Sequence, residues 1–180
     1  MVTGPSGAGK GTLIRALLER VPELRVAISA TTRPRRPGEE HGREYWFQTE
    51  AEFDRHVEAG DFLEWVRYVS GQRYGTLWSE VDRIIGAGES CVLELETQGA
   101  KEVKRQRPDA VTIFISAPSF DELERRLTDR ATESAGEIGE RLALARRQMD
   151  ESVDFDHVVV NDDVARATGE LVAIVRDGHA

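Results

Sequence analysis

The sequence has a single cysteine, Cys91, among its 180 residues. One thiol cannot form an internal disulfide, and its place at the apolar run 92–95 predicts a buried, reduced side chain of an intracellular protein. No segment has the length of a membrane span, and no charged-then-apolar leader opens the chain. We therefore expect a cytoplasmic protein without a membrane partner.

Positive charge is also scarce, because 24 lysines and arginines face 33 aspartates and glutamates, for a net charge of −9. A protein that coats nucleic acid normally has the opposite balance, so we expect no nucleic-acid partner. The length of 180 residues and the 39% share of hydrophobic residues suit one soluble globular domain. Basic residues cluster at 33–36, 101–107 and 125–147, where they can hold small polyanions.

A glycine-rich segment, GPSGAGKGT at 4–12, begins almost at the first residue. Its glycines allow successive backbone N–H groups to point into one concavity, and Lys10 adds a charge that can reach a nucleotide's outer phosphates. Apolar residues recur behind it with helical spacing, so a helix aims its positive end at the anion. This GxxxxGK pattern is typical of a P-loop, although Gly11 stands where Ser or Thr usually binds magnesium, and Thr12 follows. The alternative, a glycine-rich turn without function, leaves these matches unexplained.

Apolar β-type runs alternate with helical patterns along the rest of the chain. We expect strands at 26–29, 62–68, 72–76, 91–96, 111–116 and 157–160, and helices at 50–59, 77–87, 99–105, 120–130, 137–151 and 164–175. Ser119 is the expected N-cap of the helix from Phe120, with Glu122 three residues on. Strands separated by helices predict an α/β fold whose parallel sheet is covered on both faces.

Two features of this organisation stand out. The stretch 33–76 breaks the alternation with hairpin-like spacing, so we expect it to be a small mixed-β insert on a core formed by 1–32 and 77–180.

Only three residues precede Gly4, whereas a P-loop normally follows a central strand of about five residues. A very short strand and a chain that has lost upstream residues are both compatible with this, and the lost hydrogen bonds of a short central strand favour the second.

A second basic element, SATTRPRRPGEEHGREYWF, occupies 29–47. Arg33 directly precedes Pro34, and Arg35 and Arg36 lie between Pro34 and Pro37. The two prolines stiffen the backbone and present the guanidinium forks outward. Arginine is preferred where a phosphate is held by two hydrogen bonds. Alone, such a segment is more often a solvated basic loop. Beside a P-loop, it predicts a second phosphate site.

Together these elements resemble the guanylate kinases, from Val2 to about Leu171. The resemblance rests on GPSGAGKGTL at 4–13, SATTRPRRPGEEHGREYWF at 29–47, DFLEW at 61–65, RYGT at 73–76, LELETQGA at 93–100, ERRLTDRATE at 124–133 and VNDD at 160–163. The TTRxxRxGE…Y element is specific to that family among nucleoside monophosphate kinases. The resemblance implies a P-loop fold with a GMP-binding insert at 33–76, a short helical lid at about 130–140, and transfer of the γ-phosphoryl group of ATP to GMP, with dGMP as a second acceptor.

The resemblance also implies roles for individual residues. For ATP these are Gly4, Ser6, Gly7, Ala8, Gly9, Lys10, Gly11, Thr12 and, at the adenine, Asn161. For the phosphate of GMP they are Arg33, Arg36, Tyr45 and Tyr74, and for its base Ser29, Glu64, Thr76 and Glu96. Catalysis falls to Lys10 with the lid arginines Arg126, Arg130 and Arg141. A carboxylate such as Glu64 accepts hydrogen bonds from guanine N1–H and its amino group, whereas adenine has an unprotonated N1 there. The alternative for Glu64 is a surface carboxylate on a strand edge.

Mg²⁺ is the implied cofactor, carried with ATP. No direct protein ligand is assigned to it, and Thr12, Glu94 and Glu96 are the candidates. The chain departs from the family at Gly11, at Glu96 where Asp is usual, and at Asp129 and Ala131 where glycines are usual. Two other functions stay open: a non-catalytic guanylate-kinase-like binding module, and a P-loop kinase for another phosphorylated acceptor. Such modules lose P-loop residues, so Lys10 and the intact glycines favour an enzyme.

Overall fold

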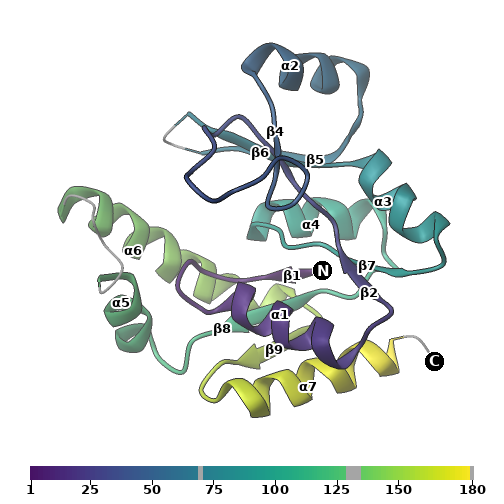
Figure 1. The fold of residues 1–180 in the computed structure, drawn as a ribbon. Coiled ribbons are helices and arrows are strands. Elements are labelled where there is room, and N and C mark those ends of the chain that lie inside the picture. Colours follow the sequence, from purple (N-terminus) through teal and green to yellow (C-terminus); the bar gives the residue numbers. More distant parts are fainter. Residues whose placement is uncertain (69–70, 129–134, 179–180) are drawn as a thin grey trace. The chain divides into compact units, whose positions relative to one another are not determined.

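The structure, a computed structural model, describes residues 1–68, 71–128 and 135–178 (Figure 1). Its contacts divide the chain into two units, Met1–Pro22 with Glu94–Ala180, and Glu23–Leu93. We call them the first and the second unit and describe each by itself. The insert boundaries that the sequence suggests, 33 and 76, fall inside the second unit and stay a prediction. No helix within the described ranges is long and apolar enough to span a bilayer.

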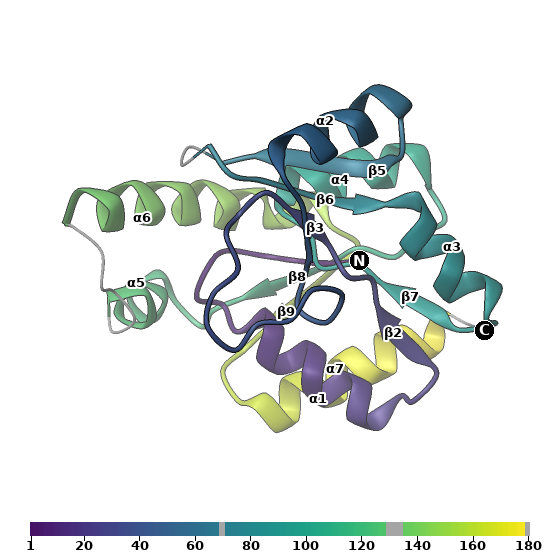
Figure 2. The same cartoon turned by 45° about the horizontal axis from the view of Figure 1, so that its top comes forward.

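The first unit is built on a parallel sheet in the order β1-β8-β9. Its strands are β1 (Val2–Thr3), β8 (Ile113–Ser116) and β9 (His157–Val160). The strand β8 lies at the centre, and its apolar residues Ile113, Phe114 and Ile115 are buried, as a parallel sheet covered on both faces requires. Helices α1 (Lys10–Arg20) and α7 (Val164–Asp177) cover one face, and α4 (Thr97–Gln106) covers the other (Figures 1 and 2). The expected helix-flanked parallel sheet is confirmed.

Two further helices complete the first unit, α5 (Phe120–Thr128) and α6 (Ala135–Asp150), and a 3₁₀ turn at Glu151–Asp154 follows them. The Ser119 hydroxyl accepts a hydrogen bond of 3.2 Å from the Glu122 N–H, which is the expected N-cap of α5. The two helices pack through a small apolar cluster, formed by Ala117, Leu123, Leu127 and Ala145 with Leu142 and Met149. This packing holds α5 against the second half of α6.

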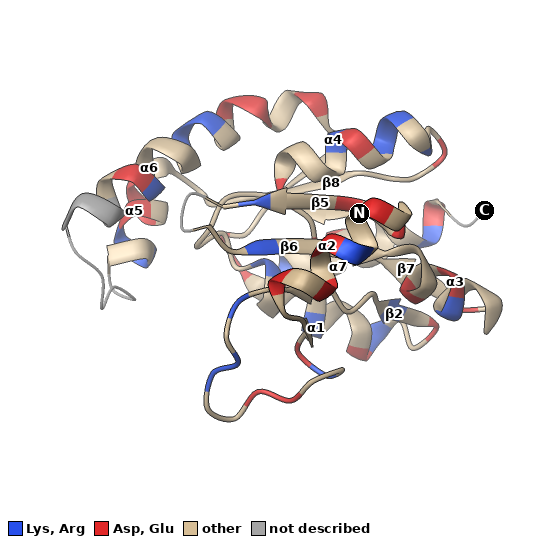
Figure 3. Ribbon diagram, turned by 90° about the horizontal axis from the view of Figure 1, so that it is seen from above, with Lys and Arg blue, Asp and Glu red and all other residues tan. Residues whose placement is uncertain are grey.

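The second unit contains a parallel pair, β2 (Leu24–Val26) with β7 (Ser90–Val92), and a mixed sheet in the order β4-β3-β6-β5. The strands of the mixed sheet are β3 (Ala30–Thr31), β4 (Trp46–Phe47), β5 (Phe62–Arg67) and β6 (Arg73–Leu77). Its core joins Ala30, Phe53 and Leu77 to Trp46, Val57 and Phe62. Figure 3 shows basic and acidic segments in succession along the long loop between β3 and β4.

Two helices flank the sheets of the second unit. The first, α2 (Glu50–Ala59), has the bounds expected from the sequence because both of its ends are marked locally. A capping box joins Thr49 to Glu52, and Gly60 ends the helix in the left-handed region at φ 71°. The second helix, α3 (Trp78–Gly86), follows β6 directly and buries Val81 and Ile84.

Two expected strands are wrong in their bounds. The run 26–29 is a junction: β2 ends at Val26, β3 begins at Ala30, and the Ile28 N–H donates to Glu80 Oε1 at 3.1 Å rather than to a neighbouring strand. The strand expected at 91–96 ends at Val92, and Glu94 forms only an isolated bridge with Val2. Cys91 is half-buried rather than buried, although its surroundings still raise the pKa of the thiol to about 11 by desolvation.

Candidate functional site

The glycine-rich loop joins β1 to α1. Gly9 is the N-cap of α1 at φ 88°, and its carbonyl accepts hydrogen bonds of 3.1 Å from the N–H groups of Thr12 and Leu13. At Gly4, with φ 139°, a Cβ would lie 2.2 Å from the Ile115 carbonyl oxygen. Glycine is therefore required at both positions, and the loop runs directly into the amino end of a helix, the arrangement that binds phosphates.

Two cationic side chains lie on this loop. Lys10 Nζ donates to the carbonyl oxygens of Gly4 at 2.8 Å and Pro5 at 3.2 Å, so its ammonium group lies across the loop. From α6, the Arg141 guanidinium donates to Ser6 Oγ at 2.9 Å. Lysine and arginine from distant parts of the sequence thus meet at the glycine-rich loop.

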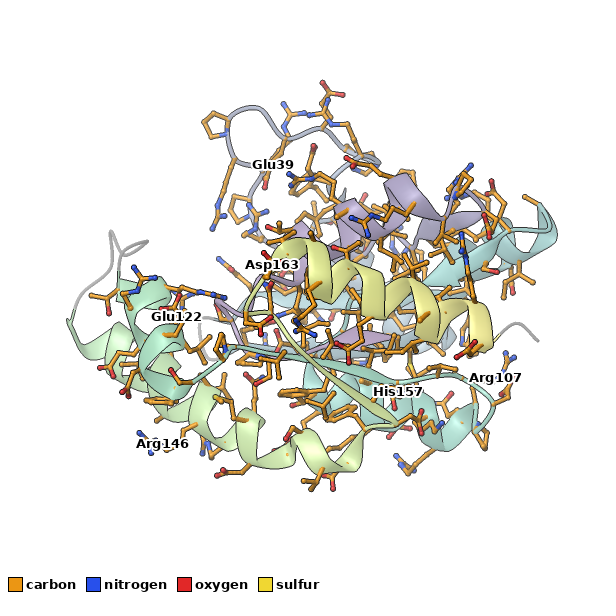
Figure 4. All side chains as sticks on the ribbon, turned by 90° about the horizontal axis from the view of Figure 1, so that it is seen from below. Glu39, Arg107, Glu122, Arg146, His157 and Asp163 are labelled. Atoms are coloured by element: carbon orange, nitrogen blue, oxygen red, sulfur yellow. The ribbon has the colours of Figure 1, made fainter. Side chains whose placement is uncertain are left out.

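A third cation belongs to α5. Arg126 Nε donates to Glu122 Oε1 at 2.8 Å, and a terminal nitrogen donates to the Asn161 carbonyl at 3.3 Å. Hydrogen bonds from Arg125 and then Arg126 lower the pKa of Glu122 to about 2, so the carboxylate is ionised and holds both arginines (Figure 4 labels it on α5). The remaining predicted lid arginine, Arg130, lies outside the described residues, as do Asp129 and Ala131.

Asn161, expected from the resemblance near adenine, lies at the carboxyl end of β9 and is only 5% exposed. Its Nδ2 donates to the Ala8 carbonyl in the glycine-rich loop at 2.8 Å. The sequence offered no signal for this contact, because 153 positions separate the two residues.

The three residues predicted for the metal lie in different surroundings. Glu96 is the N-cap residue of α4. Its Oε2 accepts a hydrogen bond of 3.0 Å from Nε2 of Gln148. Gln148 is a buried residue of α6 that no sequence pattern marked. Thr12 and Glu94 are exposed. Within the described parts of the chain, no group of three or more His, Cys, Asp or Glu could hold a metal ion. These residues fit a cation carried by nucleotide oxygens and water rather than one held in a protein cage.

In the second unit, the predicted phosphate-binding residues surround a buried arginine. Arg33 is 7% exposed, donates to Glu39 through two nitrogens at 2.8 and 3.0 Å, and has its guanidinium 5.3 Å from the Tyr45 ring centroid. The Tyr45 and Tyr74 rings meet edge to face at 5.8 Å. The Arg36 N–H also donates to Glu39, at 2.8 Å, while its side chain is exposed. No role for Glu39 was expected from the sequence. The acidic pair inside a basic loop is the pattern that could have indicated one.

The predicted base-reading residues lie on two paired strands of the same sheet. Glu64 on β5 is directly opposite Thr76 on β6, and the Thr76 hydroxyl donates to Glu64 Oε1 at 2.9 Å. They are 9% and 1% exposed, so Glu64 is not a surface carboxylate. Ser29 is half-buried, and its carbonyl accepts a hydrogen bond of 2.9 Å from the Trp46 N–H. Glu96, the remaining member of that set, belongs to the first unit.

A parallel strand, a glycine-rich loop with its lysine and a following helix define the first unit as a P-loop kinase fold. The same fold is found in the crystal structure of a shikimate kinase from Bacteroides thetaiotaomicron, with a TM-score of 0.54 and 16% identity over 97% of this chain and 96% of that one. At this identity the likeness concerns the fold alone.

The guanylate kinase family model matches residues 1–177, and the chain belongs to this family. It is 51% identical to the guanylate kinase of Rubrobacter xylanophilus, over 98% of this chain and 92% of the relative. The guanylate kinase of Symbiobacterium thermophilum is 46% identical, over 97% and 82%. The crystal structure of guanylate kinase from Anaplasma phagocytophilum matches with a TM-score of 0.78 and 28% identity, over 98% of this chain and 84% of that chain.

Proposed function

We propose that this protein transfers the γ-phosphoryl group of ATP to GMP, and also to dGMP, giving ADP and the nucleoside diphosphate. The observation that carries the proposal is the buried Glu64–Thr76 pair, on the same sheet as the Arg33, Tyr45 and Tyr74 cluster. A carboxylate for the guanine edge and a cationic, aromatic site for a phosphate suit one ligand, GMP. Family membership supports the same conclusion.

The acceptor needs no general base, because the attacking oxygen of the GMP phosphate is already ionised. That oxygen forms a bond to the γ-phosphorus of ATP while the bond from this phosphorus to the β–γ bridging oxygen breaks. Catalysis is then positioning and electrostatic stabilisation of the migrating group. We assign this to the amides of the glycine-rich loop, Lys10, Arg126 and Arg141. Arg130 stays a prediction from the sequence.

Selection of guanine is assigned to Glu64. Its carboxylate accepts from guanine N1–H and the amino group, and Thr76 fixes its orientation. Adenine would set an unprotonated N1 against the carboxylate and leave it unpaired, which discriminates by several orders of magnitude in sites of this kind. Arg33, Arg36, Tyr45 and Tyr74 hold the phosphate, so that orientation of the base also orients the attacking oxygen.

Phosphoryl transfer in this family requires a divalent metal, and we propose Mg²⁺. When bound with ATP it neutralises charge on the phosphates. Thr12, Glu94 and Glu96 are the residues that would hold it, through the water molecules that magnesium retains. We further propose that the enzyme works in the cytoplasm, in keeping with its single free thiol.

A coupled assay of ADP release tests the proposal with four acceptors: GMP, dGMP, AMP and ribose 5-phosphate. We expect turnover with GMP and dGMP and little with the others. Faster turnover of AMP than of GMP would contradict the guanine specificity. Absence of turnover with every acceptor would favour a non-catalytic binding module, and turnover of ribose 5-phosphate would favour a kinase for another acceptor.

A further inference from the structure

The chain has one asparagine, Asn161, and the first unit places it under the glycine-rich loop. Its backbone N–H donates to the Ser116 carbonyl at 2.8 Å, which extends the β8–β9 ladder, so the sheet fixes the position of the residue. Its side chain is buried, and Nδ2 donates to the Ala8 carbonyl at 2.8 Å. A rigid donor thus holds one peptide group of the loop.

The orientation of that peptide group decides where a neighbouring donor points. In a planar trans peptide, the C=O of Ala8 and the N–H of Gly9 point in opposite directions. Because the carbonyl is turned toward Asn161, the Gly9 N–H is turned away from it. In a phosphate-binding loop, such an amide is one of the donors offered to the anion.

The shape of the loop is matched to the same side chain. Gly9 has φ 88°, and a Cβ built on it would lie 2.3 Å from Asn161 Nδ2. The space that a side chain at position 9 would need is therefore taken by the asparagine amide. The positive φ favours glycine there, and a side chain at position 9 would also have to displace the asparagine amide.

Asn161 also contacts a predicted lid arginine. Arg126 donates to the Asn161 carbonyl at 3.3 Å while its Nε is held by Glu122 at 2.8 Å. One buried residue therefore touches both the loop that binds the phosphates and an arginine that is assigned to the same phosphates.

From these contacts we propose that Asn161 is a positioning residue for the phosphates of ATP: it orients the Ala8–Gly9 peptide so that the Gly9 N–H faces the anion. This differs from the adenine contact that the family resemblance implies for the same position. It deepens the proposed function, since it rests on ATP being the phosphoryl donor. The two roles separate by experiment, because one depends on the phosphates and the other on the base.

Asn161→Leu keeps the apolar bulk and removes the donor, and Asn161→Ala removes both. Calorimetry with Mg²⁺ measures the binding of ATP and of inorganic tripolyphosphate, which has no base. We expect either variant to weaken both ligands by a similar factor, about tenfold, as for the loss of one strong hydrogen bond. The KM for GMP should change by less than about twofold, since it binds elsewhere. Weaker ATP binding with unchanged tripolyphosphate binding would overturn the proposal in favour of base reading, and unchanged binding of both would overturn it outright.

Thr112→Val is the matched control. Thr112 is a buried polar residue at the other end of the first unit's sheet, and its hydroxyl donates to Asp156 Oδ2 at 2.8 Å. We expect this variant to lower the melting temperature but to bind tripolyphosphate normally. An equal loss of affinity in Thr112→Val would mean that general destabilisation explains the effect, and would overturn the positioning role. The Leu and Ala variants differ in bulk, so either one that folds is sufficient. Wild-type protein that binds tripolyphosphate but does not phosphorylate GMP would contradict the proposed function alone.

Discussion

Arg33 and Glu39 form a bidentate ion pair, in which Nη2 donates to Oε1 at 2.8 Å and Nη1 donates to Oε2 at 3.0 Å. Only 8% of the Arg33 side chain and 18% of the Glu39 side chain are exposed. The same carboxylate accepts a hydrogen bond from the Arg36 N–H, so it closes the loop that contains the two prolines. Hydrogen bonds from Arg33 and then from this N–H lower the pKa of Glu39, and the pair is therefore ionised throughout the neutral range. The arginine assigned to the GMP phosphate is oriented by the protein itself.

Replacing Glu39 tests this orientation. Glu39→Gln exchanges a charge-assisted pair for an ordinary hydrogen bond, and we expect the KM for GMP to rise about fivefold, because the guanidinium is less firmly held. The KM for ATP should not change. Glu40→Gln, at an exposed neighbour that pairs with Arg43, is the control and should match the wild type. A lower KM for GMP in Glu39→Gln would mean that the carboxylate competes with the phosphate instead.

The Glu64–Thr76 pair predicts base selectivity. Glu64→Gln puts an amide N–H against a guanine donor, so we expect kcat/KM for GMP to fall about a hundredfold while that for AMP falls far less. Thr76→Val removes the hydroxyl that orients the carboxylate and should cause a smaller loss in the same direction. Steady-state kinetics with both nucleotides provide the measurement. An unchanged GMP to AMP ratio in Glu64→Gln would refute the role in base reading.

The ammonium group of Lys10 predicts loss of turnover without loss of fold. Lys10→Met keeps the aliphatic stem and removes the charge assigned to the transferred phosphoryl group, so kcat should fall by at least about a thousandfold. Circular dichroism and thermal melting should show a folded protein. Lys101→Met, which removes a half-buried lysine paired with Glu151 and Asp154, is the control and should retain activity. A near-normal kcat in Lys10→Met would show that the loop has been misassigned.

The environment of Asp156 predicts that the first unit loses stability at acid pH. Burial by itself raises the pKa of this carboxyl, but hydrogen bonds from Lys104 and from the N–H and hydroxyl of Thr112 outweigh it and lower the pKa from 3.8 to about 2. Since the folded pKa is the lower one, the contribution to stability is present above about pH 4 and is lost as the pH falls toward 2.

Asp156→Asn should therefore be less stable than the wild type at pH 7 and should lose less stability between pH 4 and 2. The side chain is 38% exposed, so solvent screening reduces the linkage value, and we expect a difference of at most about 1 kcal/mol. Urea unfolding at several pH values measures it. Parallel pH profiles for the two proteins would contradict the assignment of this loss of stability to Asp156.

Elements with local end signals could be predicted from the sequence. The helix α2 has its expected bounds because Thr49, Glu52 and Gly60 mark both ends, and β9 has its expected bounds because an apolar run is closed by polar residues. The run 26–29 was predicted wrongly, since its backbone is completed by the distant Glu80 rather than by a strand. Gln148 could not be assigned in advance, because it is defined by the partner that it contacts, whereas Glu39 was missed although its acidic pair inside a basic loop marks it.

The phosphate-binding loop is the part that the sequence by itself determined. Its glycines, its lysine and the helix behind it are contiguous, and the required backbone angles are local properties of those residues. Tertiary structure alone decided which side chains support that loop. Asn161 reaches Ala8 across 153 positions, and Arg141 reaches Ser6 across 135. Such contacts depend on which strands become neighbours in a parallel sheet and where the crossover helices return, and no local pattern in the sequence carries that information.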